Sequence, residues 1–198
     1  ELEERFAIIY GGKDAVFDLS EGMIVPISDM RNICTNRELH RRWAESPNKK
    51  IVREYNVGFD PTEKDRSIIC NTFTGWPTRP KSGCCELLLE SLAHLCSAEH
   101  NSVEVYQWLL KWLAYPIQNP GAKMQSAIVV HGPQGAGKTQ FFKAVGRIYG
   151  KHGLTIGQSA IENPRNTWLS SRLYILVEEG FARDEMYHNK NPIKDLIT

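Results

Sequence analysis

The stretch VVHGPQGAGKTQFF, residues 129–142, decides how this chain is interpreted. An apolar run enters it, a glycine-rich turn follows, and a helix-like segment begins after a lysine and a threonine. The turn fits the pattern G-x-x-x-x-G-K-[ST] in full. Glycines at these positions let backbone N–H groups wrap a phosphate where a Cβ would block the approach. The residues expected to bind a nucleotide are Gly132, Pro133, Gln134, Gly135, Ala136, Gly137, Lys138 and Thr139.

Two side chains of this stretch have expected chemical roles. Lys138 reaches the β and γ phosphates and serves catalysis, and Thr139 offers its hydroxyl to Mg²⁺. ATP and Mg²⁺ are therefore the expected cofactors. The alternative is a glycine-rich turn without a ligand.

A second stretch, LYILVEEG at residues 173–180, has an apolar strand pattern that ends in two acids. We expect Glu178 to hold Mg²⁺, directly or through water, and Glu179 to act as the catalytic base that polarises the attacking water. Two acids favour hydrolysis over transfer to an alcohol. The alternative is a pair of solvated acids at a strand end.

The chain has 198 residues, and its pattern predicts an α/β protein in three parts. Residues 1–80 form a small mixed α/β module with a hairpin around Gly11 and Gly12, residues 81–120 are helical, and residues 121–198 form a P-loop core. In that core a buried strand at 126–131, a helix at 139–150 and a strand at 172–177 begin a parallel sheet.

Several side chains are expected in the core or on the surface without a chemical role. Trp108, Trp112 and Tyr115 have helical spacing and are predicted to be core residues. The five cysteines show no framework spacing and indicate reduced thiols in a cytoplasmic setting. A zinc site would use His94, His100 and nearby cysteines, but no CxxC pair is present, so we interpret them as core and surface residues.

The run from Val105 to Gly150 resembles the superfamily 3, AAA+-like helicase domains of phage and plasmid replication proteins, which are often fused behind a primase or primase–polymerase. The likeness rests on Trp112-Leu113-Ala114, on Gln118-Asn119-Pro120 and on the glycine-rich turn. ICNTFTGW at 69–76 and NTWLSSRLYILVEE at 166–179 are similar to flanking segments of that family. In all, the resemblance covers about residues 55–198.

The resemblance implies an ATP-dependent DNA helicase that assembles as a ring, usually a hexamer, with a neighbour's arginine completing each site. A primase or polymerase domain in the same polypeptide is a further implied partner. Two departures stand out. Glu178-Glu179 replaces the family's Asp-Glu or Asp-Asp, and the sequence ends before the sensor residue, DNA hairpin and arginine finger. We therefore expect a truncated core that is not fully active alone.

Two other functions stay open. One is a P-loop kinase acting on a small molecule, although such chains usually carry the P-loop near the N-terminus. The other is a non-catalytic module that docks DNA or primase and responds to nucleotide. The formal charge of +1 gives no overall signature for nucleic acid, so DNA contact needs a local patch.

The candidate DNA-binding patch lies near the N-terminus, on a predicted helix and the residues after it. Trp43 lies among its basic residues and is placed to stack a base, unless this is a solvated helix face with Trp43 in the core. No apolar run is long enough to span a bilayer, and we expect a cytoplasmic protein, in the host cytoplasm if the source is viral. The patch residues are Arg37, Arg41, Arg42, Lys49, Lys50 and Arg53.

Overall fold

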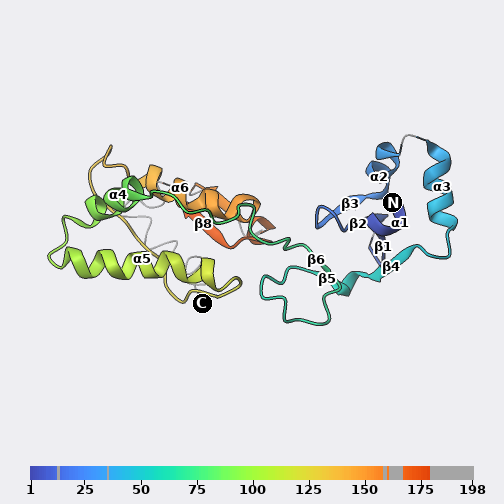
Figure 1. Cartoon of the computed structure of the whole chain (residues 1–198), viewed down its shortest axis with the longest axis horizontal. Coiled ribbons are helices and arrows are strands. Elements are labelled where there is room, and N and C mark those ends of the chain that lie inside the picture. Colours follow the sequence, from blue (N-terminus) through green and yellow to red (C-terminus); the bar gives the residue numbers. More distant parts are fainter. Residues whose placement is uncertain (13, 35, 158–159, 161–166, 179–198) are drawn as a thin grey trace. The chain divides into compact units, whose positions relative to one another are not determined.

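The computed structural model describes residues 1–12, 14–34, 36–157, 160 and 167–178, and it divides into two compact units, Glu1–Gly75 and Trp76–Thr198. Both units mix helices with short strands (Figure 1). Each unit has a hydrophobic core of its own. Within the described residues, no helix combines the length and apolar character needed to cross a membrane.

The first unit is built on a four-stranded sheet in the order β3-β2-β1-β4. Strands β1 (Phe6–Tyr10) and β2 (Ala15–Asp18) form the expected antiparallel hairpin, and β3 (Met23–Pro26) extends it. Strand β4 (Lys50–Arg53) pairs with β1 in parallel. The predicted hairpin is confirmed.

Side chains alternate between the two faces of this sheet, as the period of a strand requires. Phe6 and Val16 pack with Met30 and Trp43 on one face. Ala7, Ile9, Phe17, Val52 and Cys70 form the core on the other face. Both faces of the sheet are thus covered within one unit.

Short helices complete the first unit: α1 (Leu2–Arg5), α2 (Ile27–Ile33), α3 (Arg37–Glu45) and the 3₁₀ turn η1 (Glu54–Asn56). Asn36 is the N-cap of α3, and its side-chain oxygen accepts from the N–H of Glu38 at 2.8 Å. Strands β5 (Val57–Gly58) and β6 (Cys70–Asn71) pair in parallel.

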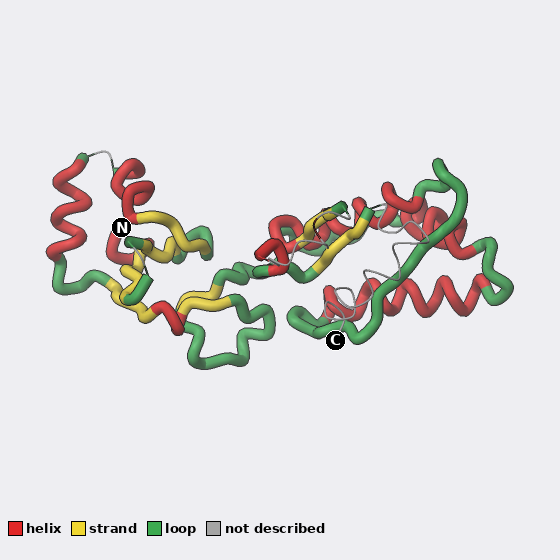
Figure 2. The backbone as a smooth tube through the Cα atoms, turned by 180° about the vertical axis from the view of Figure 1, so that it is seen from behind, coloured by secondary structure: helices red, strands yellow, loops and turns green. Residues whose placement is uncertain are grey.

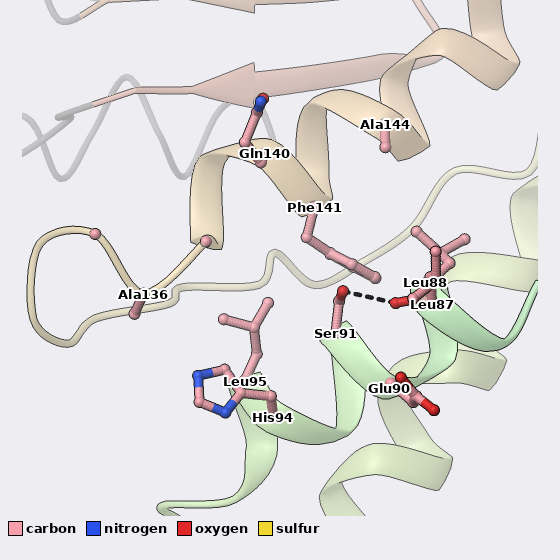
Figure 3. A pocket seen from close by; sticks show the side chains of 12 residues that line it. Leu87, Leu88, Glu90, Ser91, His94, Leu95, Ala136, Gln140, Phe141 and Ala144 are labelled. Atoms are coloured by element: carbon pink, nitrogen blue, oxygen red, sulfur yellow. Dashed lines mark hydrogen bonds between the residues drawn. The ribbon is translucent and has the colours of Figure 1, made fainter.

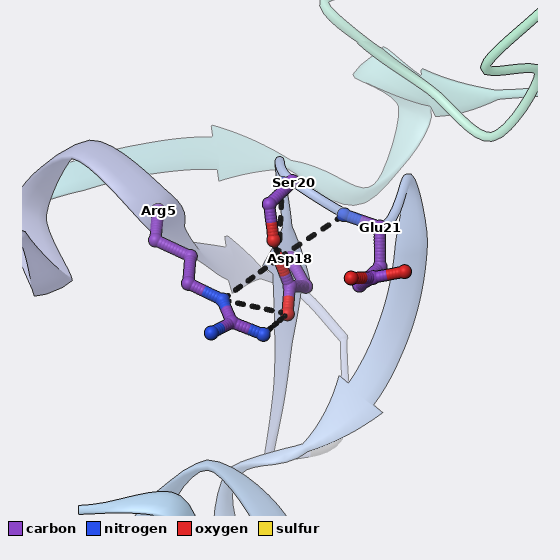
Figure 4. A network of polar contacts seen from close by, with 4 residues as sticks. All are labelled: Arg5, Asp18, Ser20 and Glu21. Atoms are coloured by element: carbon purple, nitrogen blue, oxygen red, sulfur yellow. Dashed lines mark hydrogen bonds and ion pairs between the residues drawn. The ribbon is translucent and has the colours of Figure 1, made fainter.

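A buried carboxylate joins α1 to the end of β2. Arg5 donates to both oxygens of Asp18, with Nη2 at 2.7 Å, and Ser20 donates its backbone N–H and its hydroxyl to the same carboxylate (Figure 4). The side chain of Asp18 is 4% exposed and that of Arg5 39%. A buried charge is stable only when it is paired and hydrogen-bonded in this way.

The second unit contains three longer helices, α4 (Glu86–Cys96), α5 (Ser102–Gln118) and α6 (Lys138–Tyr149). Leucines of α4 and α5 and the aromatic residues of α6 form its core. Strands β7 (Gly153–Ile156) and β8 (Tyr174–Val177) pair in parallel, with the turns η2 (Gly150–His152) and η3 (Thr167–Leu169) before them.

Helix α6 lies against the two-stranded sheet with little between them. A Cβ added to Gly153 would stand 2.7 Å from the carbonyl oxygen of Gly146, and one added to Gly146 would stand 3.1 Å from the ring of Tyr174. Tyr174 stacks on Tyr149 with ring centroids 5.0 Å apart and donates its hydroxyl to the carbonyl of Phe142 at 2.9 Å. Glycines thus allow a close helix–strand contact.

Two predictions for this unit are wrong. Residues 126–131 form no strand; Figure 2 colours the segment between α5 and α6 as loop. Ile128 and Val130 pack on the core, but Val129 is 73% exposed, because no described strand pairs with this segment. Trp108 and Tyr115 were expected in the core and are 53% and 51% exposed, because the core-facing side of α5 is formed by Leu109 and Leu113.

Candidate nucleotide-binding site

The glycine-rich turn has the backbone conformation that its glycines make possible. Gly132, Gly135 and Gly137 have φ angles of 144°, 84° and 82°, a region that L side chains rarely adopt. An added Cβ at any of the three would meet no atom within 4 Å apart from its chain neighbours. Backbone conformation, and not crowding by the rest of the protein, therefore requires glycine here, and the loop borders open space.

The side chain of Lys138 lies across the loop and binds its backbone. Its ammonium group donates to the carbonyl oxygens of Gly132 at 2.9 Å and Pro133 at 2.6 Å. Lys138 is also the first residue of α6, where Gly137 is the N-cap without a side-chain acceptor. The first N–H groups of a helix have no partner within it and carry a partial positive charge. An ammonium group and free helix N–H groups at one place make an anion-binding arrangement.

The remaining loop residues lie at the surface. Pro133 and Gln134 are exposed and Ala136 is half-buried. Thr139 is exposed in the first turn of α6, next to Lys138. Its hydroxyl is an oxygen donor of the kind that Mg²⁺ prefers.

The acidic strand end is only partly described. Glu178 follows β8, its N–H donates to the carbonyl of Ile156 at 2.9 Å, and its carboxylate forms an ion pair with Lys143 of α6 at 2.5 Å. Glu178 is thus attached to the same helix whose N-terminus carries the loop. A carboxylate fits Mg²⁺ as a ligand, so its metal role stays a prediction, with Lys143 as the competing cation. Glu179 lies outside the described residues.

A hollow of about 740 Å³ adjoins the loop between α4 and the start of α6 (Figure 3). The loop contributes Gly135, Ala136 and Gly137, and α6 contributes Gln140, Phe141 and Ala144. The α4 wall consists of Leu87, Leu88, Glu90, Ser91, His94 and Leu95. The sequence analysis did not predict this wall. The feature of the sequence that could have indicated it is the presence of apolar residues on more than one side of α4.

The basic patch is only partly described, and most of its side chains have partners. Trp43 is buried at 3% exposure, which confirms its core interpretation and excludes base stacking in this conformation. Exposed ion pairs contribute only about 0.2–1 kcal/mol, so these side chains could exchange their partners for phosphates. DNA binding by the patch therefore stays a prediction. For Arg37 only the backbone is described. The pairs are Arg41 with Glu45, Arg42 with Glu38, Lys49 with the Ala44 carbonyl, Lys50 with the Glu4 carbonyl and Arg53 with Tyr55.

Comparison with known proteins gives one family and one structure. A family described as "Family of unknown function (DUF5906)" matches residues 130–198, which include the glycine-rich loop and the acidic strand. The apo structure of the NrS-1 C-terminal region, residues 305–718, is similar with a TM-score of 0.73 and 17% sequence identity. No curated protein matches.

The NrS-1 likeness extends over 98% of this chain and 47% of the NrS-1 region, so the chain spans about half the length of that structure. It supports the predicted α/β fold class across both units. At this identity the likeness concerns the fold alone.

Proposed function

We propose that residues 132–139 bind the phosphates of ATP with Mg²⁺, and that the chain is part of an ATP-dependent DNA helicase that acts in replication. The observation that carries the proposal is the loop itself. Three glycines with positive φ border open space, and Lys138 lies across the loop at the N-terminus of α6. The motif, its conformation and the helix that follows all favour the same ligand.

The residues have separate tasks in this proposal. Lys138 exchanges the two carbonyl oxygens for the β and γ phosphate oxygens, which carry full negative charge and attract an ammonium group more strongly. The N–H groups of the loop and of the first turn of α6 hold the same phosphates. Thr139 and Glu178 supply oxygen ligands for Mg²⁺, and Glu179 orients and deprotonates the attacking water. Bound Mg²⁺ would neutralise charge on the phosphate oxygens.

Lys143 gives the site a constraint that the motif does not contain. Its ammonium group lies 2.5 Å from the Glu178 carboxylate. For Glu178 to bind Mg²⁺, it exchanges this ion pair for the metal. The helicase assignment also implies a ring, a neighbour's arginine and DNA as partner.

Binding is tested by titrating ATP and Mg²⁺ into the chain in a calorimeter. Lys138→Ala is expected to lose binding, since it removes the charge that faces the phosphates. Lys111→Ala is the matched control, because Lys111 is an exposed lysine of α5 in the same unit and does not line the loop hollow. Equal affinity of the two variants, or no ATP binding by the parent chain, would refute the proposal.

The reaction is tested on the full-length protein with forked DNA. DNA-stimulated ATP hydrolysis and strand separation are expected, and both should be lost in Glu179→Gln while ATP binding is kept. Phosphate transfer to a nucleoside would identify a kinase instead. If the protein binds ATP but DNA does not stimulate ATP hydrolysis, the result would identify a docking module.

A further inference from the structure

The hollow beside the loop has a wall that includes exposed leucines. Leu87 is 80% exposed and Leu88 37% exposed, both on α4. Leu87 and Leu88 are adjacent and both line the cavity, whereas single exposed apolar residues need no explanation. Its volume of about 740 Å³ lies in the range of small-molecule sites, roughly 300–1,000 Å³.

The wall of the hollow is formed mainly by residues that share one face of α4 and one face of α6. Leu88, Ser91 and Leu95 recur on α4 at intervals of three and four, with Leu87 and His94 beside them. On α6 the lining residues Gln140, Phe141 and Ala144 follow the same spacing from Gly137. The hollow is therefore a seam between two helices, and the phosphate loop closes one end of it (Figure 3).

Three polar side chains of α4 stand on this apolar seam, Glu90, Ser91 and His94, whereas the amide of Gln140 points away from α4 (Figure 3). The hydroxyl of Ser91 donates to the carbonyl of Leu87 at 2.6 Å, so its oxygen remains as an acceptor. Glu90 accepts hydrogen bonds, and His94 can both donate and accept them. Apolar walls with a few polar groups suit a flat aromatic ligand with polar edges.

We propose that the seam between α4 and α6 holds the base and ribose of the nucleotide whose phosphates bind at residues 132–139. The inference rests on the proposed function, because it takes the phosphates as the anchor. Gly135 and Gly137 belong to both the phosphate loop and the seam, so a ligand bound at the loop has the seam within reach. In this arrangement leucines of α4 cover a face of the base, and Glu90 and His94 contact its edge.

A bulky side chain inside the seam tests this directly. Ser91→Trp fills the hollow, and Ala93→Trp places the same side chain on an exposed position of α4 that does not line it. Affinities for Mg²⁺ with ATP and with inorganic tripolyphosphate are measured by calorimetry. Because the base would lose its contacts with the seam, Ser91→Trp should weaken ATP binding about tenfold to a hundredfold. Tripolyphosphate binding should not change, and Ala93→Trp should change neither.

The outcomes separate this inference from the proposed function. Unchanged ATP affinity in Ser91→Trp would overturn the base pocket, as would equal weakening of ATP and tripolyphosphate. If the parent chain bound neither compound, the phosphate site itself would fail. If Ser91→Trp does not fold, Glu90→Gln replaces it and should change the ratio of ATP to GTP affinity. The control Glu86→Gln, on α4 outside the hollow, should not. An unchanged ratio in Glu90→Gln would also count against the inference.

Discussion

Replacing Asp18 by asparagine should destabilise the first unit, and the structure sets the size of the effect. Burial alone would raise the pKa of Asp18, but hydrogen bonds from Arg5, from the Ser20 hydroxyl and from the N–H groups of Ser20 and Glu21 outweigh it. The pKa falls from an ordinary 3.8 to about 2. At about 1.4 kcal/mol for each pH unit, the ionised form contributes about 2 kcal/mol to folding.

The sign of the pH dependence follows from the lowered pKa of Asp18. A carboxyl whose folded pKa lies below its unfolded pKa stabilises the protein fully above the unfolded value. This contribution is therefore complete above about pH 4 and is lost as the pH falls toward 2. Asp18→Asn should remove about 2 kcal/mol at pH 7 and much less at pH 2.

Urea unfolding followed through the backbone amide NMR signals of β1 and β2 reports on this unit within the whole chain. Asp29→Asn is the matched control, since Asp29 is exposed on α2 in the same unit and accepts from the hydroxyl of its neighbour Ser28. An Asp18→Asn loss below about 0.5 kcal/mol at pH 7, or a loss that does not shrink on acidification, would refute the reasoning.

Gly153→Ala should cost about 1–3 kcal/mol of the stability of the second unit, because its Cβ would stand 2.7 Å from the Gly146 carbonyl oxygen; Gly157→Ala, with open space around the added Cβ, is the control in thermal unfolding. Lys143→Met should lower the Mg²⁺ concentration at which ATP binds, because it releases the Glu178 carboxylate; an unchanged Mg²⁺ dependence would argue against Glu178 as a metal ligand. Replacing Arg41 and Arg42 by glutamine should remove one to two phosphate contacts with single-stranded DNA. The slope of log binding constant against log salt concentration should then become less steep by about 0.7 for each contact, while the ATP affinity stays the same. An unchanged slope would show that these residues do not bind DNA.

Local patterns predicted the parts of this fold that depend on neighbouring residues. The hairpin around Gly11 and Gly12 and the glycine-rich loop before α6 both need positive φ, and glycine supplies it wherever the rest of the chain lies. Helix α6 follows from its apolar spacing and was predicted within a residue of its bounds.

Burial and pairing at a distance were not predictable in the same way. The aromatic spacing of α5 showed that Trp108 and Tyr115 share a face, but not that Leu109 and Leu113 occupy the side toward the core. The run at 126–131 has the composition of a strand, yet a strand exists only where a partner offers hydrogen bonds. For the same reason, no motif indicated that Lys143 meets Glu178 or that α4 borders the loop.

The glycine contact between α6 and β7 has a mechanical consequence. Gly146 and Gly153 meet without intervening side chains, and Lys143 fastens the same helix to the residue after β8. The side chains of Tyr174 and Tyr149 pack beside this point, and between the two glycines the backbones face each other directly. A helix of 12 residues is about 18 Å long and stiff along its axis. A displacement of α6 along its axis should therefore reach β7 through this backbone contact, and β8 through the Tyr174 ring and the Lys143–Glu178 ion pair.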